Sequence, residues 1–147
     1  MKEYTVKVFD DGTKKWYLDG NLHREDGPAI EYTSGTKEWW LNGKLHRENG
    51  PAIEWANGDK SWWLNDKHHR EDGPAIEYTN GDKFWYLNGK RHREDGPAIE
   101  FANSTKEWWL NGELQTEEEF NARTQVKELS VAELQKMLGF NIKIVDM

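Results

Sequence analysis

The sequence repeats one motif at a constant step of 23 residues, and this repeat restricts the fold more than any other feature. A tryptophan followed two residues later by a leucine marks each copy, at Trp16, Trp39, Trp62, Trp85 and Trp108. The full unit, read from Trp39, is WWLNGKLHRENGPAIEWANGDKS. Four complete units are flanked by partial ones, with Tyr4 to Lys15 resembling a second half and Trp108 to Leu114 a first half. Such a chain is expected to form an array in which each unit packs on its neighbours.

Each unit carries two turn signals between short β-prone segments. Asp-Gly or Asn-Gly follows Trp-x-Leu at residues 19–20, 42–43, 88–89 and 111–112, and Asn65-Asp66 is a weaker version in the third unit. These dipeptides favour a type I′ hairpin turn, because both central residues need positive φ. A second reversal is predicted at residues 34–35, 57–58 and 80–81. Proline cannot donate to a β-ladder, so the Gly-Pro segment of each unit predicts a bulge, a bend or a sheet edge.

The fold class that follows is an all-β repeat array, an antiparallel β-hairpin meander with two strands per unit. Strand alternation places Trp39 and Leu41 on one face and Trp40 on the other. At about 4.8 Å per strand, each unit should advance the array by about 10 Å. We expect the retained Trp and Leu residues to form a buried row shared by stacked units.

The last part of the chain has helical signals instead of the repeat. We divide the chain into a hairpin array over residues 1–115 and a helical cap with a final strand over residues 116–147. Thr116 to Glu119 is a capping box that begins a helix ending near Arg123. A second helix begins at Ser130, where Leu129 and Leu134 form a hydrophobic staple, and ends at Gly139. The cap either covers an open sheet edge or forms a contact between copies of the chain.

Composition excludes several classes of protein. The formal net charge is -7, and an acidic chain repels phosphate backbones and anionic lipids, so neither long nucleic acids nor membranes are expected partners. There is no cysteine, which excludes disulfide scaffolds and thiol catalysis. No apolar run has the roughly 18 residues of a membrane span. The expected product is a soluble cytoplasmic protein.

The unit also resembles a known family. The order aromatic-Trp/Tyr-Leu-Asn-Gly-Lys-x-His, followed by glycine and a second Asn-Gly turn, resembles MORN repeats and their divergent variants. The string WYLNGKxHREDGPAIEY and the ending KELSVAELQKMLGFNIKIV are similar to tandem-repeat proteins of tailed bacteriophages and some giant viruses. The resemblance covers nearly the whole chain and implies a β-hairpin array of viral source that acts in the host cytoplasm. A typical MORN unit has His-Gly-x-Gly after its turn, where this unit has His-Arg-Glu-Asp/Asn-Gly-Pro.

The His-Arg-Glu-Asp motif invites a catalytic interpretation, with His as base and Glu as its partner. An active site is usually one asymmetric constellation, whereas this set occurs four times without a nucleophile or a phosphate loop. We therefore predict a structural bridge and no enzyme activity. The repeated histidines are too far apart to share a metal ion, and His68 is interpreted as a surface residue, so no metal and no cofactor are expected.

Ligand binding is a stronger hypothesis, because aromatic residues could stack a base while arginine binds phosphate. The candidates are the second aromatic residue of each unit and the arginine of the motif: Tyr17, Trp40, Trp63, Tyr86 and Trp109, with Arg24, Arg47, Arg70 and Arg93. Alternatively, these aromatic residues pack on neighbouring units. Asn49 replaces the usual aspartate, so Arg47 is the best candidate for an unpaired guanidinium, flanked by Trp40 or Trp63. If it has a partner, that partner is a carboxylate across the ladder such as Glu54.

The residue features predict non-enzymatic binding, and the resemblance to phage repeats implies a viral accessory protein that counters host defence. The expected target is a host protein, and Phe84, which stands where Glu38, Ser61 and Glu107 stand in other units, is the candidate anchor. A nucleotide immune signal held in aromatic-arginine clefts is the first alternative, and a structural scaffold is the second. Homo-oligomers through the C-terminal cap are a further expectation.

Overall fold

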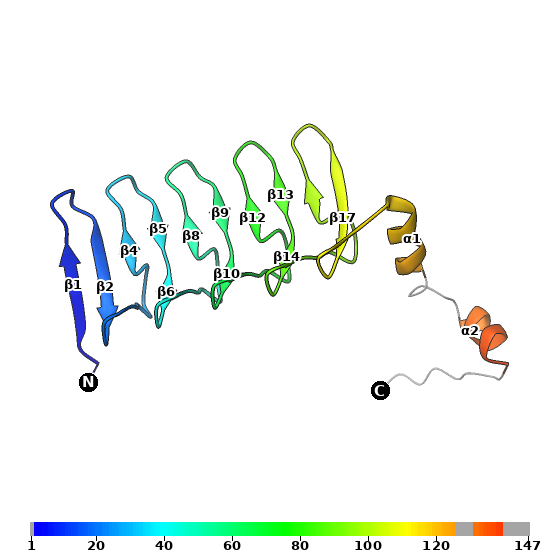
Figure 1. Cartoon of the computed structure of the whole chain (residues 1–147), viewed down its shortest axis with the longest axis horizontal. Helices are drawn as coiled ribbons and strands as arrows, with labels where there is room; N and C mark the ends of the chain where they lie inside the picture. The colour runs from blue at the N-terminus through cyan, green and yellow to red at the C-terminus, as the bar shows by residue number, and fades with distance from the viewer. Residues whose placement is uncertain (1, 126–130, 140–147) are drawn as a thin grey trace.

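The computed structural model describes residues 2–125 and 131–139, and its β-hairpins stand side by side in one row (Figure 1). This arrangement confirms the predicted antiparallel meander with C-terminal helices. The strands are β1 (Tyr4–Val8), β2 (Lys14–Leu18), β3 (Asn21–Leu22), β4 (Ile30–Glu31), β5 (Lys37–Glu38), β6 (Trp40–Leu41), β7 (Lys44–Leu45), β8 (Ile53–Glu54), β9 (Lys60–Ser61), β10 (Trp63–Leu64), β11 (Lys67–His68), β12 (Ile76–Glu77), β13 (Lys83–Phe84), β14 (Tyr86–Leu87), β15 (Lys90–Arg91), β16 (Ile99–Glu100), β17 (Lys106–Leu110) and β18 (Glu113–Gln115). The helices are α1 (Glu117–Gln125) and α2 (Val131–Leu138).

One twelve-stranded sheet runs through all units in the order β1-β2-β4-β5-β8-β9-β12-β13-β16-β17-β18, with β3 beside β2. The pairs β6-β7, β10-β11 and β14-β15 are the short hairpins around the Asn-Gly turns. Backbone hydrogen bonds connect the two regions, because Trp39 N–H donates to Ala52 O (2.8 Å) and His46 N–H donates to Trp39 O (3.0 Å). Each unit is therefore two antiparallel strands, and a loop from Arg47 to Pro51 interrupts the second. This loop, with bends at residues 48–50, is the bend among the alternatives that the proline predicts.

Both predicted turns have the backbone conformation that their sequences favour. Asn42 and Gly43 have φ of 50° and 74°, and Asn65 and Asp66 have 50° and 63°, as a type I′ turn requires. At the other end of the unit, Gly58 N–H donates to Trp55 O and Trp55 N–H donates to Asp59 O. That pattern is a three-residue hairpin loop with a left-handed final residue.

Neighbouring units are joined near the Asn-Gly turns by single backbone hydrogen bonds. Gly43 N–H donates to Leu22 O (2.9 Å), and Arg24 N–H donates to Trp40 O (3.1 Å). The third unit adds a side-chain bond, because the Asp66 carboxylate accepts from Leu45 N–H at 2.8 Å. The units are thus coupled along both halves of every hairpin.

The buried row differs from the predicted one. The fully buried residues are alanines that follow the loop proline, and the isoleucines after them are mostly buried: Ala29, Ala52, Ala75, Ala98, Ile30, Ile53 and Ile99. The retained tryptophans and leucines are only half-buried. Alternation correctly places Trp39 and Trp40 on opposite faces, but a single sheet has no second layer to cover either of them. The prediction that Trp and Leu form the buried row is therefore wrong.

The C-terminal end of the array carries the predicted helices. The capping box is confirmed, because Thr116 Oγ1 accepts from Glu119 N–H (3.1 Å) and the Glu119 carboxylate accepts from Thr116 N–H (2.9 Å). Helix α1 lies against β17 and β18, with Phe120 buried. Helix α2 ends as predicted, with Gly139 at φ 72°. The proposed N-cap Ser130, its neighbour Leu129 and the final strand near residues 142–144 lie outside the described residues.

Candidate functional site

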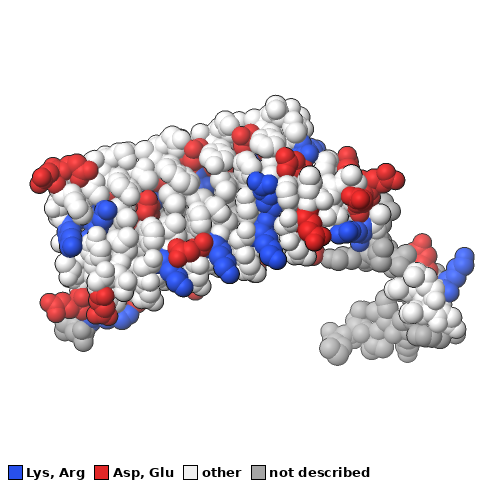
Figure 2. Space-filling model, in the orientation of Figure 1, with Lys and Arg blue, Asp and Glu red and all other residues white. Residues whose placement is uncertain are grey.

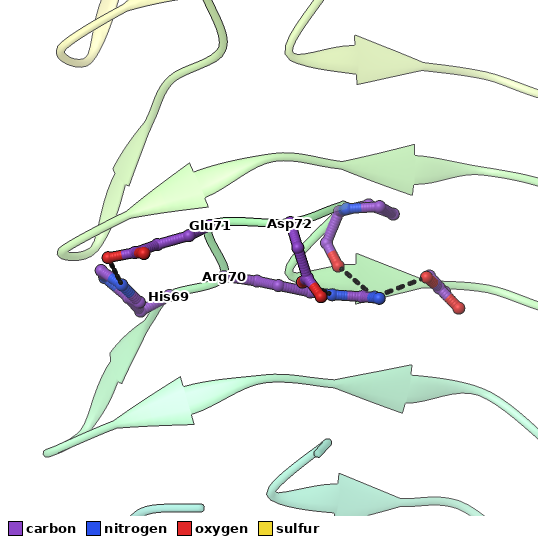
Figure 3. A network of polar contacts seen from close by, with 6 residues as sticks. His69, Arg70, Glu71 and Asp72 are labelled. Carbon is purple, nitrogen blue, oxygen red and sulfur yellow. Dashed lines mark hydrogen bonds and ion pairs between the residues drawn. The ribbon is translucent and has the colours of Figure 1, made fainter. Parts of the chain in front are cut away.

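The arginine of each unit contacts its own loop, the strand that follows the loop and a tryptophan ring. In the third unit, Arg70 Nε donates to Asp72 (2.8 Å), and Nη1 donates to Pro74 O (3.1 Å) and to Glu77 (2.7 Å) (Figure 3). The guanidinium lies 3.9 Å from the centre of the Trp62 ring. A Cβ added to Gly73 would meet Arg70 Cζ at 3.0 Å. The motif therefore places a cation against both an aromatic ring and a glycine, which explains why the unit has glycine there.

The same contacts recur in the other units. Arg24 binds Asp26, two residues further along the chain, and Glu31, seven residues further along. Arg93 binds Asp95 and Glu100 at the same spacings. These arginines hold the pKa of the partner aspartates below its usual value, through hydrogen bonds and opposite charge, at Asp26, Asp72 and Asp95.

Arg47 has an incomplete set of partners because Asn49 replaces the aspartate. Its Nη1 donates to Glu54 and Pro51 O, both at 2.9 Å, but within residues 2–125 its Nε has no carboxylate partner. Arg47 is thus paired with Glu54, seven residues further along the chain in β8 and not across a ladder, and is the least neutralised of the four. It lies 3.8 Å from the Trp39 ring centre, and not on Trp40 or Trp63 as predicted.

The histidines connect successive units. His23 Nδ1 accepts from Asn42 N–H at 3.0 Å, and His92 Nδ1 accepts from Asn111 N–H at 3.0 Å. His23 Nδ1 also lies 2.9 Å from Asn42 Oδ1, and its Nε2 lies 3.6 Å from Glu25. The geometry therefore makes each histidine a bridge to the next Asn-Gly turn.

The predicted aromatic-arginine clefts do not form with the predicted aromatic residues. Clefts of about 530, 640 and 750 Å³ lie between successive loops, and they are lined by Trp39, Trp62 and Trp85 respectively. We call this side, with its loops and the first tryptophan of each unit, the loop face. The second aromatic residues lie on the other face because adjacent strand residues alternate. The backbone N–H groups of Arg24, Arg47, Arg70 and Arg93 donate to the carbonyl oxygens of Trp40, Trp63, Tyr86 and Trp109, but the side chains of the two sets lie on opposite faces.

The opposite side, which we call the aromatic face, carries two rows of rings. One row is Tyr17, Trp40, Trp63, Tyr86 and Trp109, and its strand partners at the neighbouring register positions are Leu22, Leu45, His68, Arg91 and Leu114. The second row lies at the start of the three-residue hairpin loops, which we call the upper turns. It consists of Phe9, Tyr32, Trp55, Tyr78 and Phe101. Trp55 is 37% exposed and Tyr78 is 41% exposed. Figure 2 shows broad uncharged areas over the array, with charged side chains in separate groups.

One position on the aromatic face decides how polar each unit is. Glu38 accepts hydrogen bonds from Tyr32 Oη (3.2 Å) and Trp40 Nε1 (2.8 Å), so this carboxylate connects the two rows. Phe84 stands at the same position in the fourth unit and packs edge-on between Tyr78 and Phe101, at ring distances of 5.7 and 5.8 Å. Phe84 is half-buried and is not a lone exposed aromatic residue. Sequence reasoning missed Tyr78 and Phe101 as its neighbours, although Tyr78 and Phe84 face the same side by alternation across the turn.

His68 is part of the aromatic face and is not an isolated surface residue. Its ring lies 3.6 Å from the Trp63 ring centre and 5.1 Å from that of Tyr86. Burial between these rings lowers the pKa of His68 from 6.5 to about 4. Leucine occupies the same position at Leu22 and Leu45, which explains why an uncharged ring fits there.

Neither a comparison with protein-family models nor one with the sequences of curated proteins finds a match for this chain. Within residues 2–125 and 131–139, no helix is both long and apolar enough to cross a lipid bilayer. The same residues contain no group of three or more His, Asp or Glu placed to hold a metal ion.

Proposed function

We propose that the chain is a non-enzymatic binding array, a viral accessory protein that captures a host protein on its aromatic face. The observation that carries this proposal is the uncharged cluster of Tyr78, Phe84 and Phe101 beside the exposed ring of Trp55. Exposed tryptophan and tyrosine side chains in an apolar surrounding are the residues that most often anchor protein partners. The rigid sheet holds these rings in place before binding, which lowers the entropic cost of association.

The loop face is less suited to an anionic ligand. Three of its four arginines already bind two carboxylates each, and each cleft carries additional acidic side chains, such as Glu71 and Glu94 beside the largest. A phosphate would have to replace these carboxylates and approach others of the same charge. The geometry therefore supports protein capture over nucleotide capture.

The proposal is tested by capture from a bacterial lysate with Phe84→Glu as the decisive variant. Glutamate occupies this position in two other units, at Glu38 and Glu107, so the substitution is compatible with the fold. Lys44→Gln is the matched control, because it changes the charge by the same amount at an exposed position on the loop face. We expect Phe84→Glu to lose a captured protein that wild type and Lys44→Gln retain. Equal capture by all three proteins would contradict the role of the aromatic face.

Nucleotide sequestration remains the second candidate because of Arg47, whose Nε has no carboxylate partner within residues 2–125 and which borders a cleft of about 640 Å³. Calorimetry of wild type and Arg47→Ala with cyclic dinucleotides, cyclic trinucleotides and ADP-ribose tests this candidate. Heat that is lost in Arg47→Ala would support sequestration. No heat, together with no captured protein, would leave a structural scaffold.

A further inference from the structure

Among the described residues, 2–125 and 131–139, no strand pairs with the outer edge of the N-terminal strand β1. Strand β1 is the first in the strand order, and its one neighbour in the described sheet is β2. All five of its residues pair with β2 in regular register, from Tyr4 opposite Leu18 to Val8 opposite Lys14. It has no proline and no bulge, which are common devices against edge-to-edge pairing.

The two ends of the array differ in how they are protected. Helix α1 lies against the last strands, β17 and β18, and buries Phe120 there. On β1, by contrast, Val6 is 46% and Val8 is 66% exposed, and both lie on the side of the sheet that carries Trp16. A regular edge strand with exposed valines is a surface to which another strand can add.

The backbone direction shows which groups of β1 are available. Phe9 N–H donates to Thr13 O, so the odd-numbered residues of this strand direct their backbone groups towards β2. Successive residues alternate, so Tyr4, Val6 and Val8 direct N–H and C=O outward. The backbone N–H and C=O groups of an antiparallel partner strand must therefore form hydrogen bonds with those of the even-numbered residues.

We propose that this partner is a second copy of the chain, whose β1 pairs antiparallel with β1 about a two-fold axis at Thr5. In this register Tyr4 faces Val6 of the other copy, and the two residues exchange backbone hydrogen bonds. Lys7 faces Glu3 of the other copy. The interface therefore contains two opposite-charge pairs, on the face of the sheet that carries the Thr5 side chain. A register centred on Val6 would place Lys7 opposite threonine and leave Glu3 without a basic partner, so charge complementarity selects the first register.

The pairing has a consequence for the whole assembly. Residues directly opposite each other in a sheet share a face, so both aromatic faces would lie on the same side of one continuous sheet. Two copies would then present their binding surfaces together, which raises the apparent affinity for a partner with two sites. The pairing stands independently of the proposed capture function.

Sedimentation of the full chain across micromolar to millimolar concentrations tests the proposal with two charge variants. Glu3→Lys and Lys7→Glu each create two like-charge pairs in a dimer of one variant, so each should weaken the dimer about tenfold. An equal mixture of the two variants restores both opposite-charge pairs and should form a heterodimer of wild-type strength. Val6→Pro removes an outward N–H without removing a bond to β2 and should be monomeric. Circular dichroism checks that each variant is folded.

Three results would overturn the proposal. Wild type that is monomeric at every concentration would show that the edge does not pair. A dimer that Val6→Pro leaves intact would place the contact elsewhere, such as the C-terminal tail. A mixture of the charge variants no stronger than either variant alone would exclude the Thr5-centred register.

Discussion

At the scale of single residues, the most retained motif of the chain has a structural explanation. Arginine in His-Arg-Glu-Asp is fixed by two carboxylates, a carbonyl oxygen, a tryptophan ring and a glycine, and histidine accepts from the backbone of the next unit. A motif that would suggest catalysis in another chain therefore holds the loop and joins the units. The residues that differ between units, such as Phe84 and His68, are the ones that give each unit its own surface.

Gly73→Ala should destabilise the protein because its Cβ would meet Arg70 Cζ at 3.0 Å. The backbone of Gly73 is not in the left-handed region, so the cost comes from the displaced guanidinium and should be roughly 1–2 kcal/mol. Urea unfolding measures this cost. In an Arg70→Ala background the same glycine change should cost little, and an equal cost in both backgrounds would exclude the contact as its cause.

His68 should make the fold sensitive to acid. Its pKa is about 4 in the folded chain and about 6.5 when unfolded, so between these values the unfolded chain takes up a proton that the folded chain does not. Stability is therefore complete above pH 6.5 and falls as the pH approaches 4. Allowing for partial exposure, the loss should be roughly 1–2 kcal/mol. Urea unfolding at pH 7 and pH 4.5 should show a smaller loss for His68→Leu, and an identical loss in both proteins would contradict the stacked position.

At the scale of elements, turns and caps could be predicted from the sequence, whereas the buried row could not. Asn-Gly and Thr-x-x-Glu act through local backbone geometry, so type I′ turns and the capping box follow from a few adjacent residues. Burial of Ala52 instead of Trp39 depends on where the loop of the unit folds, which no local pattern states. The predicted contact of Arg47 with Trp40 or Trp63 was wrong for a related reason. Strand alternation tells which face a side chain occupies, but it does not show that the Arg47 side chain folds onto Trp39.

Gly43→Val should destabilise the Asn42-Gly43 turn, while Lys44→Ala should change stability little. Gly43 has φ 74°, where a β-branched residue is strained by roughly 1–3 kcal/mol, and its added Cβ would lie 3.3 Å from Asn21 Oδ1. Lys44 is exposed beside the same turn. Equal urea midpoints for the two variants would contradict the type I′ geometry.

Ser104→Gly should stabilise the last upper turn. Ser104 has φ 71° at a position where the other units have glycine, so replacing it removes strain and should gain about 0.5–1 kcal/mol. Asp66→Gly is the comparison, because Asp66 also has positive φ but its carboxylate accepts from Leu45 N–H. Thermal unfolding should rise for Ser104→Gly and not for Asp66→Gly, and a rise of the same size in both would show that the Asp66 bond contributes nothing.

At the scale of the whole molecule, a single sheet presents two faces with different chemistry. The loop face consists of acidic loops around engaged arginines. The aromatic face has two rows of rings that single charged side chains such as Glu38, Arg91 and Glu107 contact, and around Phe84 the rings contact one another. Because every unit contributes to both faces, the array is a rigid strip along which a partner can make repeated contacts. Helix α1 covers one end of the strip, and the open strand β1 lies at the other.

Capture on the aromatic face is tested most directly by oxidative footprinting of aromatic side chains with and without the captured protein. Bound partner should protect Trp55, Tyr78 and Phe101 from oxidation, because these rings border the uncharged cluster around Phe84. Trp62 and Trp85, which lie on the loop face beneath Arg70 and Arg93, should be oxidised equally in both states. Protection of Trp62 and Trp85 with no change at Trp55 and Tyr78 would contradict binding by the aromatic face.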